Sequence, residues 1–359
     1  MTSADLNQTT TGTTTIKNFS VAPQILESPN RNEETFYDNP NYAKNLGYYK
    51  TIPEYKKALD ALGIWACGKG CTADDRTSVI LEHITGNGKQ SFQQIMISHL
   101  KTKKNNGDSY IHIIRDDDGN LLNLKLLNPS RIRVVYSPNG IILRYEQLDL
   151  EKTNVLHTFD PEEILHSINE PVGDETHGVS ALEACKEVID TRNEVMADIR
   201  RFMHLSTIRV MYIDADDPNR INQVKTQYAE AIKKGTLLII PAKKGEAEFQ
   251  DLSVPPIEAH LSYVRYLEDF FYTAVGIKKL FMGGSNQETQ TDNKMGYMTF
   301  DPVYSTEQLE LEADLWNQVG IKVDFNRPVE LGGLMNENEE KNTGQIGMQA
   351  NEINPEAEE

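Results

Sequence analysis

Residues 178–204 read GVSALEACKEVIDTRNEVMADIRRFMH, and residues 257–276 read IEAHLSYVRYLEDFFYTAVG. In the first segment, Ser180 and Glu183 have the S-x-x-E spacing of a capping box, which marks the start of a helix. The second segment ends at Gly276, a residue type that commonly follows the last turn of a helix. The pattern therefore predicts two long helices that flank an insert.

Apolar side chains cover more of these two helices than packing against one neighbour requires. The second helix carries one apolar row through Leu267 and another, at a different angle, through Tyr266. A helix that is apolar on several sides is enclosed by neighbours, so the two helices either fold back on the body or pack against other copies of the chain. Large exposed apolar patches usually mark interfaces, which favours packing between copies. The residues expected at that interface are Leu182, Val188, Ile189, Met196, Ile199, Leu261, Val264, Leu267, Phe270 and Phe271.

Composition limits the function more than it limits the fold. The chain has 359 residues, 54 acidic and 36 basic side chains, a formal net charge of -18 and a pI near 4.9. Lysine and arginine supply most of the affinity for nucleic acid, so tight, sequence-specific binding of DNA or RNA is not expected. Three cysteines give no disulfide framework, and the sequence carries neither a signal-peptide pattern nor a membrane-spanning run. These features indicate an intracellular, soluble protein.

The segment before the first long helix alternates between helix and strand patterns. Residues 1–45, with a threonine tract, are expected to form a flexible arm, and a capping-box pattern at Thr51 predicts the first helix. Residues 78–103 predict two helices broken at a glycine turn. Period-two patterns predict hairpins over 108–127 and 131–147. A further strand is expected at 164–168, so the fold class is α+β.

The remaining segments comprise the insert and the C-terminal part. Within the insert, a strand at 208–213, a helix at 217–234 and strands at 237–241 and 248–252 predict a βαββ module. Beyond the second long helix, we expect a polar loop, a long helix from Lys294 to about Val319 that is kinked at Asp301-Pro302, and a disordered acidic tail over 334–359.

No segment carries a complete nucleotide or metal motif. Residues 86–91 superficially resemble a phosphate-binding loop but lack two of its required positions. Cys67 and Cys71 have no second Cys or His pair to complete a zinc site. The acidic run 116–118 lacks the later glutamate of a calcium-binding loop and lies between two predicted strands. It is therefore interpreted as a hairpin turn. We therefore expect no cofactor and no metal.

The histidines provide the one enzymatic hypothesis. His112, His157 and His166 lie in or near strand patterns and could be neighbours in the fold, as a hydrolase would require. Nothing in the sequence pairs them with a nucleophile or a second carboxylate at fixed spacing. No catalytic residue is therefore expected, and the hydrolase remains an alternative to be tested against the fold.

Several short segments, in a fixed order, carry a family resemblance. They are Gly107-Asp108-Ser109-Tyr110, Asp118-Gly119, Leu126-Leu127-Asn128-Pro129-Ser130-Arg131-Ile132, Ile164-Leu165-His166, Gly178-Val179-Ser180-Ala181-Leu182, Val275-Gly276-Ile277, Leu280-Phe281-Met282-Gly283-Gly284, Asn286 and Phe300-Asp301-Pro302. In this order, they resemble the portal protein of tailed double-stranded DNA viruses, from bacteriophages or head-tailed archaeal viruses. The chain departs from the family at Ile277-Lys278, where members often have Pro-Pro, and its C-terminal extension is short for a crown.

The resemblance assigns a role to each segment. It implies a flexible arm (1–45), an α/β wing (46–178), a first stem helix (179–206), a clip (207–254), a second stem helix (255–276), a tunnel loop with a kinked wing or crown helix (277–333) and a disordered tail (334–359). The tunnel loop that would face DNA is Gly283, Gly284, Ser285, Asn286, Gln287, Glu288, Thr289, Gln290, Thr291, Asp292, Asn293 and Lys294. The clip residues that would dock partners are Asp214, Asp216, Asp217, Arg220, Lys233, Lys234, Lys243 and Lys244.

The resemblance also implies a set of partners. The chain would form a ring of about twelve subunits by head-to-tail contact. The clip would dock the large terminase subunit and later a head-completion adaptor, the wing would contact the major capsid protein, and double-stranded DNA would pass through without sequence specificity. The expected location is the portal vertex of the virion, with the host cytoplasm during assembly, and no membrane partner. A non-viral ring scaffold with the same layout is a further alternative.

Overall fold

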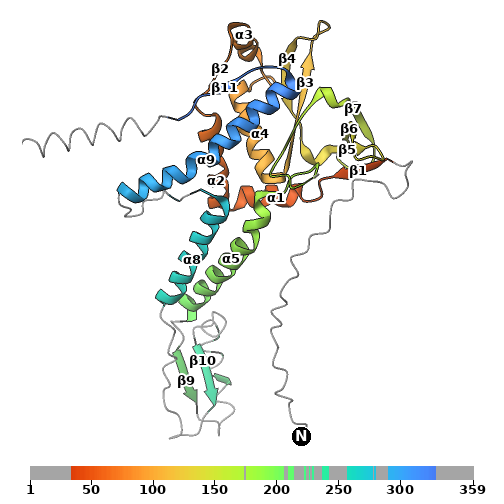
Figure 1. Ribbon diagram of the computed structural model, residues 1–359. Coiled ribbons are helices and arrows are strands. Elements are labelled where there is room, and N and C mark those ends of the chain that lie inside the picture. The colour runs from red at the N-terminus through yellow and green to blue at the C-terminus, as the bar shows by residue number, and fades with distance from the viewer. Residues whose placement is uncertain are drawn as a thin grey trace, which may run out of the picture.

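The computed structural model describes residues 34–173, 175–205, 209–213, 237–241, 257–277, 279 and 290–328, with isolated positions at 222, 223, 226 and 229. Two helices descend side by side from a mixed helix and strand body, and a pair of short strands lies at their far end (Figure 1). A third long helix crosses the body above the point where the pair leaves it. The predicted α+β class is confirmed.

The body of the fold before α5, which we call the wing, is built from two sheets and the helices that cover them. One sheet has the strand order β4-β3-β8 and the other the order β1-β5-β6-β7, with antiparallel pairing throughout. The bounds are β1 Thr35–Asp38, α1 Tyr42–Thr51, α2 Pro53–Cys67, β2 Cys71–Thr72, α3 Asp75–His83, α4 Phe92–Asn106, β3 Asp108–Arg115, β4 Leu121–Leu126, η1 Pro129–Arg131, β5 Ile132–Tyr136, β6 Ile142–Leu148, β7 Val155–Phe159, η2 Pro161–Glu163 and β8 Ile164–Ile168.

The sequence chemistry explains where the wing helices begin. Asp74 caps α3 by accepting from the backbone N–H of Thr77. Ser91 and Gln94 form a complete capping box at the start of α4, which satisfies two backbone N–H groups that would otherwise lack partners. The predicted pair of helices broken at a glycine turn is therefore present, as are both predicted hairpins and the strand at 164–168.

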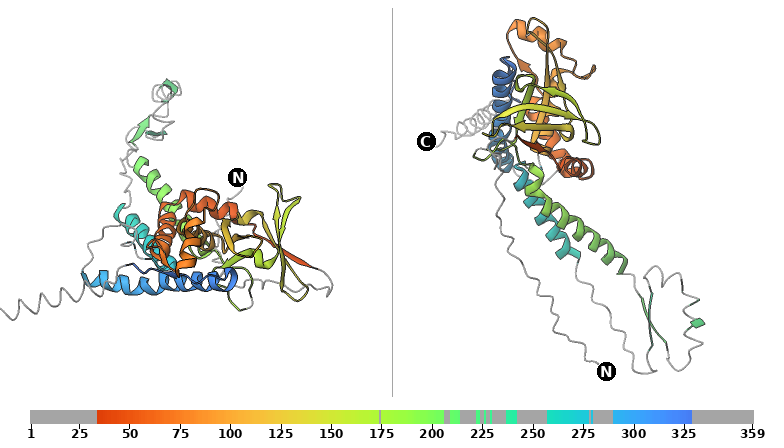
Figure 2. Two further views of the ribbon diagram at one scale, coloured as in Figure 1. Left: turned by 90° about the horizontal axis from the view of Figure 1, so that it is seen from above. Right: turned by 90° about the vertical axis from the view of Figure 1, so that its right-hand side faces the viewer.

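The stem consists of α5 (Ala181–Leu205) and α8 (Ile257–Val275), which run in opposite directions in contact with each other. They project from the wing as one antiparallel pair (Figure 2). The hydroxyl of Ser180 accepts from the N–H of Leu182 at 3.1 Å and donates to the carbonyl of Asn105 at 2.5 Å, so the predicted start of α5 is also fixed to the wing. Gly276 adopts a φ of 73°, which ends α8 as predicted.

Beyond the stem, the structure describes two strands of the insert and the C-terminal helix. β9 (Arg209–Ile213) pairs in parallel with β10 (Leu237–Pro241), as expected for strands joined by a helical crossover. Of the predicted insert helix, the structure describes only positions 222, 223, 226 and 229, which are helical, and the third strand lies outside the described residues. α9 (Gln290–Asp314) continues through Pro302 into the π-helical turn η4 (Leu315–Val319), and the short strand β11 (Asp324–Phe325) pairs with β2.

Two sequence predictions in the N-terminal part were wrong. Residues 35–45, assigned to the flexible arm, contain β1 and the start of α1. Thr51 does not cap the next helix, because it is the last residue of α1 and the N-cap of α2 is Ile52. The weakly amphipathic α1 is held by its partners: Tyr48 donates to Asp190 of α5 at 2.8 Å, and Tyr49 donates to Asp60 of α2 at 2.8 Å.

Two further corrections concern strand and helix limits. β7 was not anticipated, because its residues are mostly exposed and show no alternation. The long C-terminal helix begins at Gln290 instead of Lys294, so five residues of the predicted tunnel loop, Gln290 to Lys294, are helical. Pro302 lies inside α9, which Figure 1 draws as one continuous helix.

The wing and the stem meet where two glycines pack backbone against backbone. A Cβ on Gly107, whose φ is 90°, would lie 2.1 Å from the carbonyl oxygen of Gly178, and a Cβ on Gly178 would lie 2.2 Å from the carbonyl oxygen of Gly107. Between them, the N–H of Asn169 donates to Gly107 at 2.7 Å, and the N–H of Val179 donates to Asn169 at 3.1 Å. Side chains at either glycine would separate β3 from the start of α5.

Gly107→Ala is expected to lower the free energy of unfolding by about 3 kcal/mol, because it combines a positive φ with a backbone overlap. The matched control is Gly119→Ala, whose φ of 81° is similar but whose Cβ would meet no heavy atom within 4 Å. Urea unfolding of both variants measures the difference. Equal losses in the two variants would show that the close approach at Gly107 contributes nothing.

Candidate functional site

The stem helices bury one face against each other and against the wing. Leu182, Ile189 and Phe271 are buried together with Tyr55 and Leu59 of α2. Beside this cluster, Arg192 of α5 forms an ion pair with Glu54 of α2 at 2.9 Å. The base of the stem is therefore firmly seated on the wing within a single chain.

A second face of the stem remains exposed. Tyr263, Tyr266 and Phe270 form an aromatic row on α8 and are 45%, 62% and 50% exposed. The Tyr263 and Tyr266 rings stack with their centroids 6.4 Å apart. On α5, Met203 is also exposed. This row is an apolar surface of the kind that another protein chain covers.

The structure divides the ten predicted interface residues into three groups by their exposure. Three are exposed in the single chain, namely Met196, Leu261 and Phe270. Val188 is partly buried. The other six pack inside the chain itself: Leu182, Ile189, Ile199, Val264, Leu267 and Phe271.

A second exposed apolar surface, which the sequence reading missed, runs along α9 and into η4. Met295, Met298, Leu309 and Trp316 are 59–71% exposed. Exposed Pro302, Thr306 and Ala313 continue the same line, so the stripe repeats every three or four residues. That spacing could have been found in the sequence, because it places all seven residues on one side of a helix. We call these seven residues the α9 stripe.

The opposite side of α9 is fixed to the wing by aromatic packing. Trp65 of α2 packs against Phe300 and Tyr304 with ring centroids 5.5 and 5.7 Å away. The side-chain amide of Gln308 donates to the carbonyl of Ala66 at 2.7 Å. α9 is therefore held along one side and open along the other.

A buried ion cluster joins α9 to α4. The Lys103 ammonium lies 3.1 Å from Glu307 and 2.5 Å from Glu310, and the Lys104 ammonium lies 2.6 Å from Glu307. Lys103 is 1% exposed and Glu307 is 5% exposed. Burial lowers the pKa of Lys103, but the carboxylates outweigh that effect and its pKa is raised. Glu307 is thus the shared buried counter-ion of two lysines.

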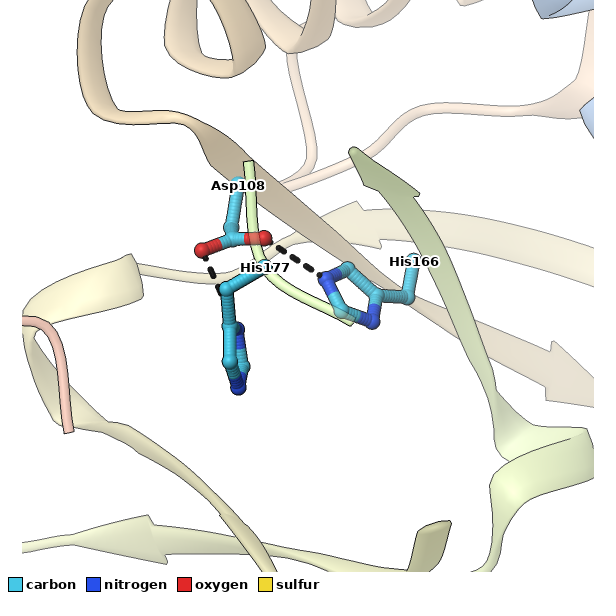
Figure 3. Close-up of side chains that lie close together, drawn as sticks. All are labelled: Asp108, His166 and His177. Atoms are coloured by element: carbon cyan, nitrogen blue, oxygen red, sulfur yellow. Dashed lines mark hydrogen bonds and ion pairs between the residues drawn. The ribbon is translucent and has the colours of Figure 1, made fainter. Parts of the chain in front are cut away.

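A cluster of Asp108, His166 and His177 lies where the two wing sheets and the stem approach each other. His166 Nε2 lies 3.1 Å from Asp108 Oδ1, and His177 Nδ1 lies 3.3 Å from Asp108 Oδ2 (Figure 3). The backbone N–H of Gly178 donates to Asp108 at 3.2 Å. Burial raises the pKa of Asp108, whereas its hydrogen bonds to the histidines lower it, and the net pKa is below the ordinary value.

The ring nitrogen of each histidine that faces away from Asp108 contacts a tyrosine hydroxyl. Tyr145 OH lies 3.2 Å from Nδ1 of His166, and Tyr136 OH contacts Nε2 of His177. Burial lowers the pKa of His177, and Asp108 offsets this only in part. His177 is therefore neutral at pH 7, with its Nδ1–H donated to the carboxylate.

A second buried histidine belongs to a separate network. His99 of α4 lies between the hydroxyls of Ser109 and Ser167, each 2.8 Å from one ring nitrogen, and Ser167 donates to Asp314 of α9. Burial lowers the pKa of His99 to about 3, so the ring is neutral. This serine, histidine and aspartate arrangement is enclosed, since Ser109 and Ser167 are buried and neither hydroxyl reaches solvent as a nucleophile would.

The three histidines of the hydrolase hypothesis do not form one site. His112 packs on Phe159 with ring centroids 4.7 Å apart, and exposed His157 packs on the same ring at 6.3 Å. His166 instead belongs to the buried cluster with Asp108. The sequence analysis did not place Asp108 or His177 beside His166, since sheet pairing and the loop before α5 bring them together.

Most of the predicted tunnel loop and clip residues lie outside the described residues. Of the tunnel loop, only Gln290, Thr291, Asp292, Asn293 and Lys294 are described, and all five belong to the backbone of α9. None of the clip residues predicted to dock partners is described. Lys279, just beyond the end of α8, forms an ion pair with Glu268 at 3.3 Å. Among the described helices, none has the length and apolar character needed to cross a membrane.

Comparison with known proteins identifies the family. A family model described as "Phage portal protein" matches residues 76–351. Among solved structures, a chain from the virion of the native gene transfer agent (GTA) particle has a TM-score of 0.61 at 14% identity, covering 89% of this chain and 93% of that chain. The neck of the native GTA particle computed with C12 symmetry gives 0.57 at 14% identity, covering 87% and 91%. A search of curated proteins found no significant match.

A portal protein solved in isolation agrees with these matches. The HK97 family phage portal protein from Corynebacterium diphtheriae has a TM-score of 0.51 at 14% identity, covering 79% of this chain and 95% of that chain. The chain belongs to the phage portal protein family. It is a portal subunit, the head-tail connector of a tailed virus, and the family is one of structural proteins. The hydrolase and the non-viral scaffold have no support among the comparisons.

Proposed function

We propose that copies of this chain close into a ring of about twelve subunits, through which viral DNA is packaged and later ejected. The resemblance to the C12-symmetric neck of the GTA particle supports the fold on which such a ring depends. The ring would occupy one vertex of the virion capsid and assemble in the host cytoplasm.

The observation that carries the proposal is a pair of different apolar surfaces on one chain. The aromatic row of α8 and the α9 stripe lie on separate helices, and both are exposed in the single copy. A head-to-tail ring needs two different surfaces on each copy, one for each neighbour, whereas a two-fold dimer needs only one self-complementary surface. The exposed surfaces therefore favour a closed ring over a dimer.

The parts of the chain suggest how the ring meets its partners. The stem sets the clip, which includes β9 and β10, at the end farthest from the wing (Figure 1). The clip would dock the large terminase subunit during packaging and a head-completion adaptor afterwards. The wing would contact the major capsid protein.

Net charge supports a channel that lets DNA move. The chain carries a formal charge of -18, so a ring of such chains repels a polyanion. Lysine-rich and arginine-rich surfaces hold DNA through its phosphates, and an acidic bore lacks that source of friction. Double-stranded DNA would therefore pass without sequence specificity.

Negative-stain imaging of the purified full chain tests the ring. We expect annular particles with a central hole wide enough for duplex DNA, and light scattering should give a mass near twelve times 40.6 kDa. A single-copy mass at every protein concentration, with no annular particles, would reject the proposal.

A further inference from the structure

Asp108, His166 and His177 come from three separate parts of the fold and meet in its interior. Asp108 begins β3, His166 is in β8, and His177 precedes α5. All three are buried, and Figure 3 shows one dashed contact from each histidine to the Asp108 carboxylate. Among the described residues, this is the group of His, Cys, Asp or Glu side chains whose spacing suits a metal ion.

The distances between the ligand atoms suit a small divalent ion. One nitrogen from each ring and one carboxylate oxygen lie within 4.8 Å of one another. The two rings contact different oxygens of the carboxylate: His166 Nε2 lies 3.1 Å from Oδ1, and His177 Nδ1 lies 3.3 Å from Oδ2. Ligands about 2.0–2.2 Å from a tetrahedral zinc ion are separated by roughly 3.3–3.5 Å, so side-chain movement would have to close three atoms that lie within 4.8 Å of one another to that spacing.

The groups behind the two rings form the outer shell that a metal-bound histidine needs. Each ring has its far nitrogen against a tyrosine hydroxyl, Tyr145 for His166 and Tyr136 for His177. Tyr136 is itself held by Thr176, whose hydroxyl donates to it at 2.9 Å. Metal-binding histidines usually direct the second nitrogen to an acceptor that fixes the ring, and a phenol oxygen can accept that N–H.

We propose that Asp108, His166 and His177 bind one zinc ion, with one ligand atom from each side chain. In the metal-free arrangement, each ring directs an N–H to Asp108. On binding, the ring nitrogen that faces Asp108 gives up its proton to become a ligand, and the far nitrogen of each ring carries an N–H that is donated to the tyrosine oxygen. The ion would place positive charge beside a carboxylate that is fully buried.

The position of the site defines its role. β3 and β8 pair in one sheet, while His177 lies one residue before Gly178, where the wing backbone touches the start of α5. A zinc ion shared by these three segments would fasten the stem to the wing within one subunit. The role is structural, and it is independent of whether copies assemble into a ring.

Zinc content and zinc affinity test the proposal on the full chain, prepared without a histidine tag. As-purified protein is expected to contain about one zinc per chain by inductively coupled plasma mass spectrometry. After removal of metal with EDTA, added ZnCl2 at about 100 times its Kd is expected to raise the Tm by roughly 5 °C. Co²⁺ in the same site should give visible d–d absorption.

Variants separate this site from adventitious binding. His166→Gln and Asp108→Asn are expected to weaken zinc binding at least about 100-fold, since each removes a ligand. His112→Gln is the matched control, because His112 lies on the same strand as Asp108 but faces Phe159. The proposal is overturned if wild-type protein is purified without zinc and its Tm does not respond to ZnCl2. This result needs no ligand variant, so it holds even if those variants fail to fold. Wild-type zinc affinity in folded His166→Gln would overturn it as well.

Discussion

Phe270→Asp is expected to abolish the ring while leaving the single chain folded. Phe270 is 50% exposed on the aromatic row of α8, so an aspartate there is solvated in the free subunit. At an interface between copies, the same carboxylate would be buried without a partner, which costs several kcal/mol at each repeated contact. Negative-stain images should show no annular particles, and light scattering should give the mass of one chain.

The adjacent residue provides a matched control. Phe271 is 5% exposed and packs with Tyr55 and Leu182 inside the chain, so Phe271→Asp should destabilise the subunit itself. The helix content measured by circular dichroism and the free energy of unfolding measured in urea should be near wild type for Phe270→Asp. Both should be strongly reduced for Phe271→Asp. Intact rings in a folded Phe270→Asp variant would exclude the aromatic row from the interface.

Glu307→Gln is expected to lower the free energy of unfolding by about 3–5 kcal/mol. The substitution keeps the size of the side chain but removes the buried charge shared by Lys103 and Lys104. Their remaining carboxylate partners, Glu310 and Glu170, are largely exposed and compensate weakly. Because Glu307 lies on α9, hydrogen exchange should also show faster opening of α9 than of β3 or β8.

Glu310→Gln is the control for this second prediction. Glu310 contacts the same lysine at 2.5 Å, but its side chain is 49% exposed, so its removal should have a small effect. Urea unfolding of both variants under the same conditions gives the comparison. A loss in Glu307→Gln no larger than in Glu310→Gln would mean that the shared buried ion pair is not what holds α9.

These two predictions concern two sides of the same assembly. The stem is seated on the wing by apolar packing and by the ion pair of Arg192 with Glu54, while α9 is seated by Trp65 and by Glu307. Each element is therefore rigidly held on one side and apolar on the other. A rigid element loses little conformational freedom when a neighbour packs against it, which favours assembly.

Local sequence patterns were sufficient to predict an element where neighbouring residues determine its first or last residue. The end of α8 follows from Gly276, and the gap between α3 and α4 follows from the glycine turn before Ser91. Both hairpins follow from alternation on either side of turn residues. α1 and β7 escaped detection because their stability comes from partners: α1 is tied to Asp190 and Asp60, and β7 pairs with β6.

The sequence predicted two apolar rows on the second stem helix. It did not predict which row packs inside the chain and which row remains exposed. Val264 and Phe271 pack inside the chain, and Tyr266 remains exposed. Periodicity gives the angle of a row around the helix axis, whereas the packing of α5 and α2 decides which angle is covered. The α9 stripe shows the same spacing of three or four residues in the sequence. It was not predicted because Pro302, which lies within it, is a residue type that usually interrupts a helix.

The sequence by itself determined the two long helices, the order of the segments, the acidic character and the family resemblance, because each depends on residues close together in the chain or on composition. Tertiary structure decided which apolar rows are open to a neighbour. It also decided that Asp108, His166 and His177 meet, and that Glu307 serves two lysines. Those contacts join residues between 58 and 204 positions apart, and only the folded chain, through β-sheet pairing and helix packing, brings them within reach.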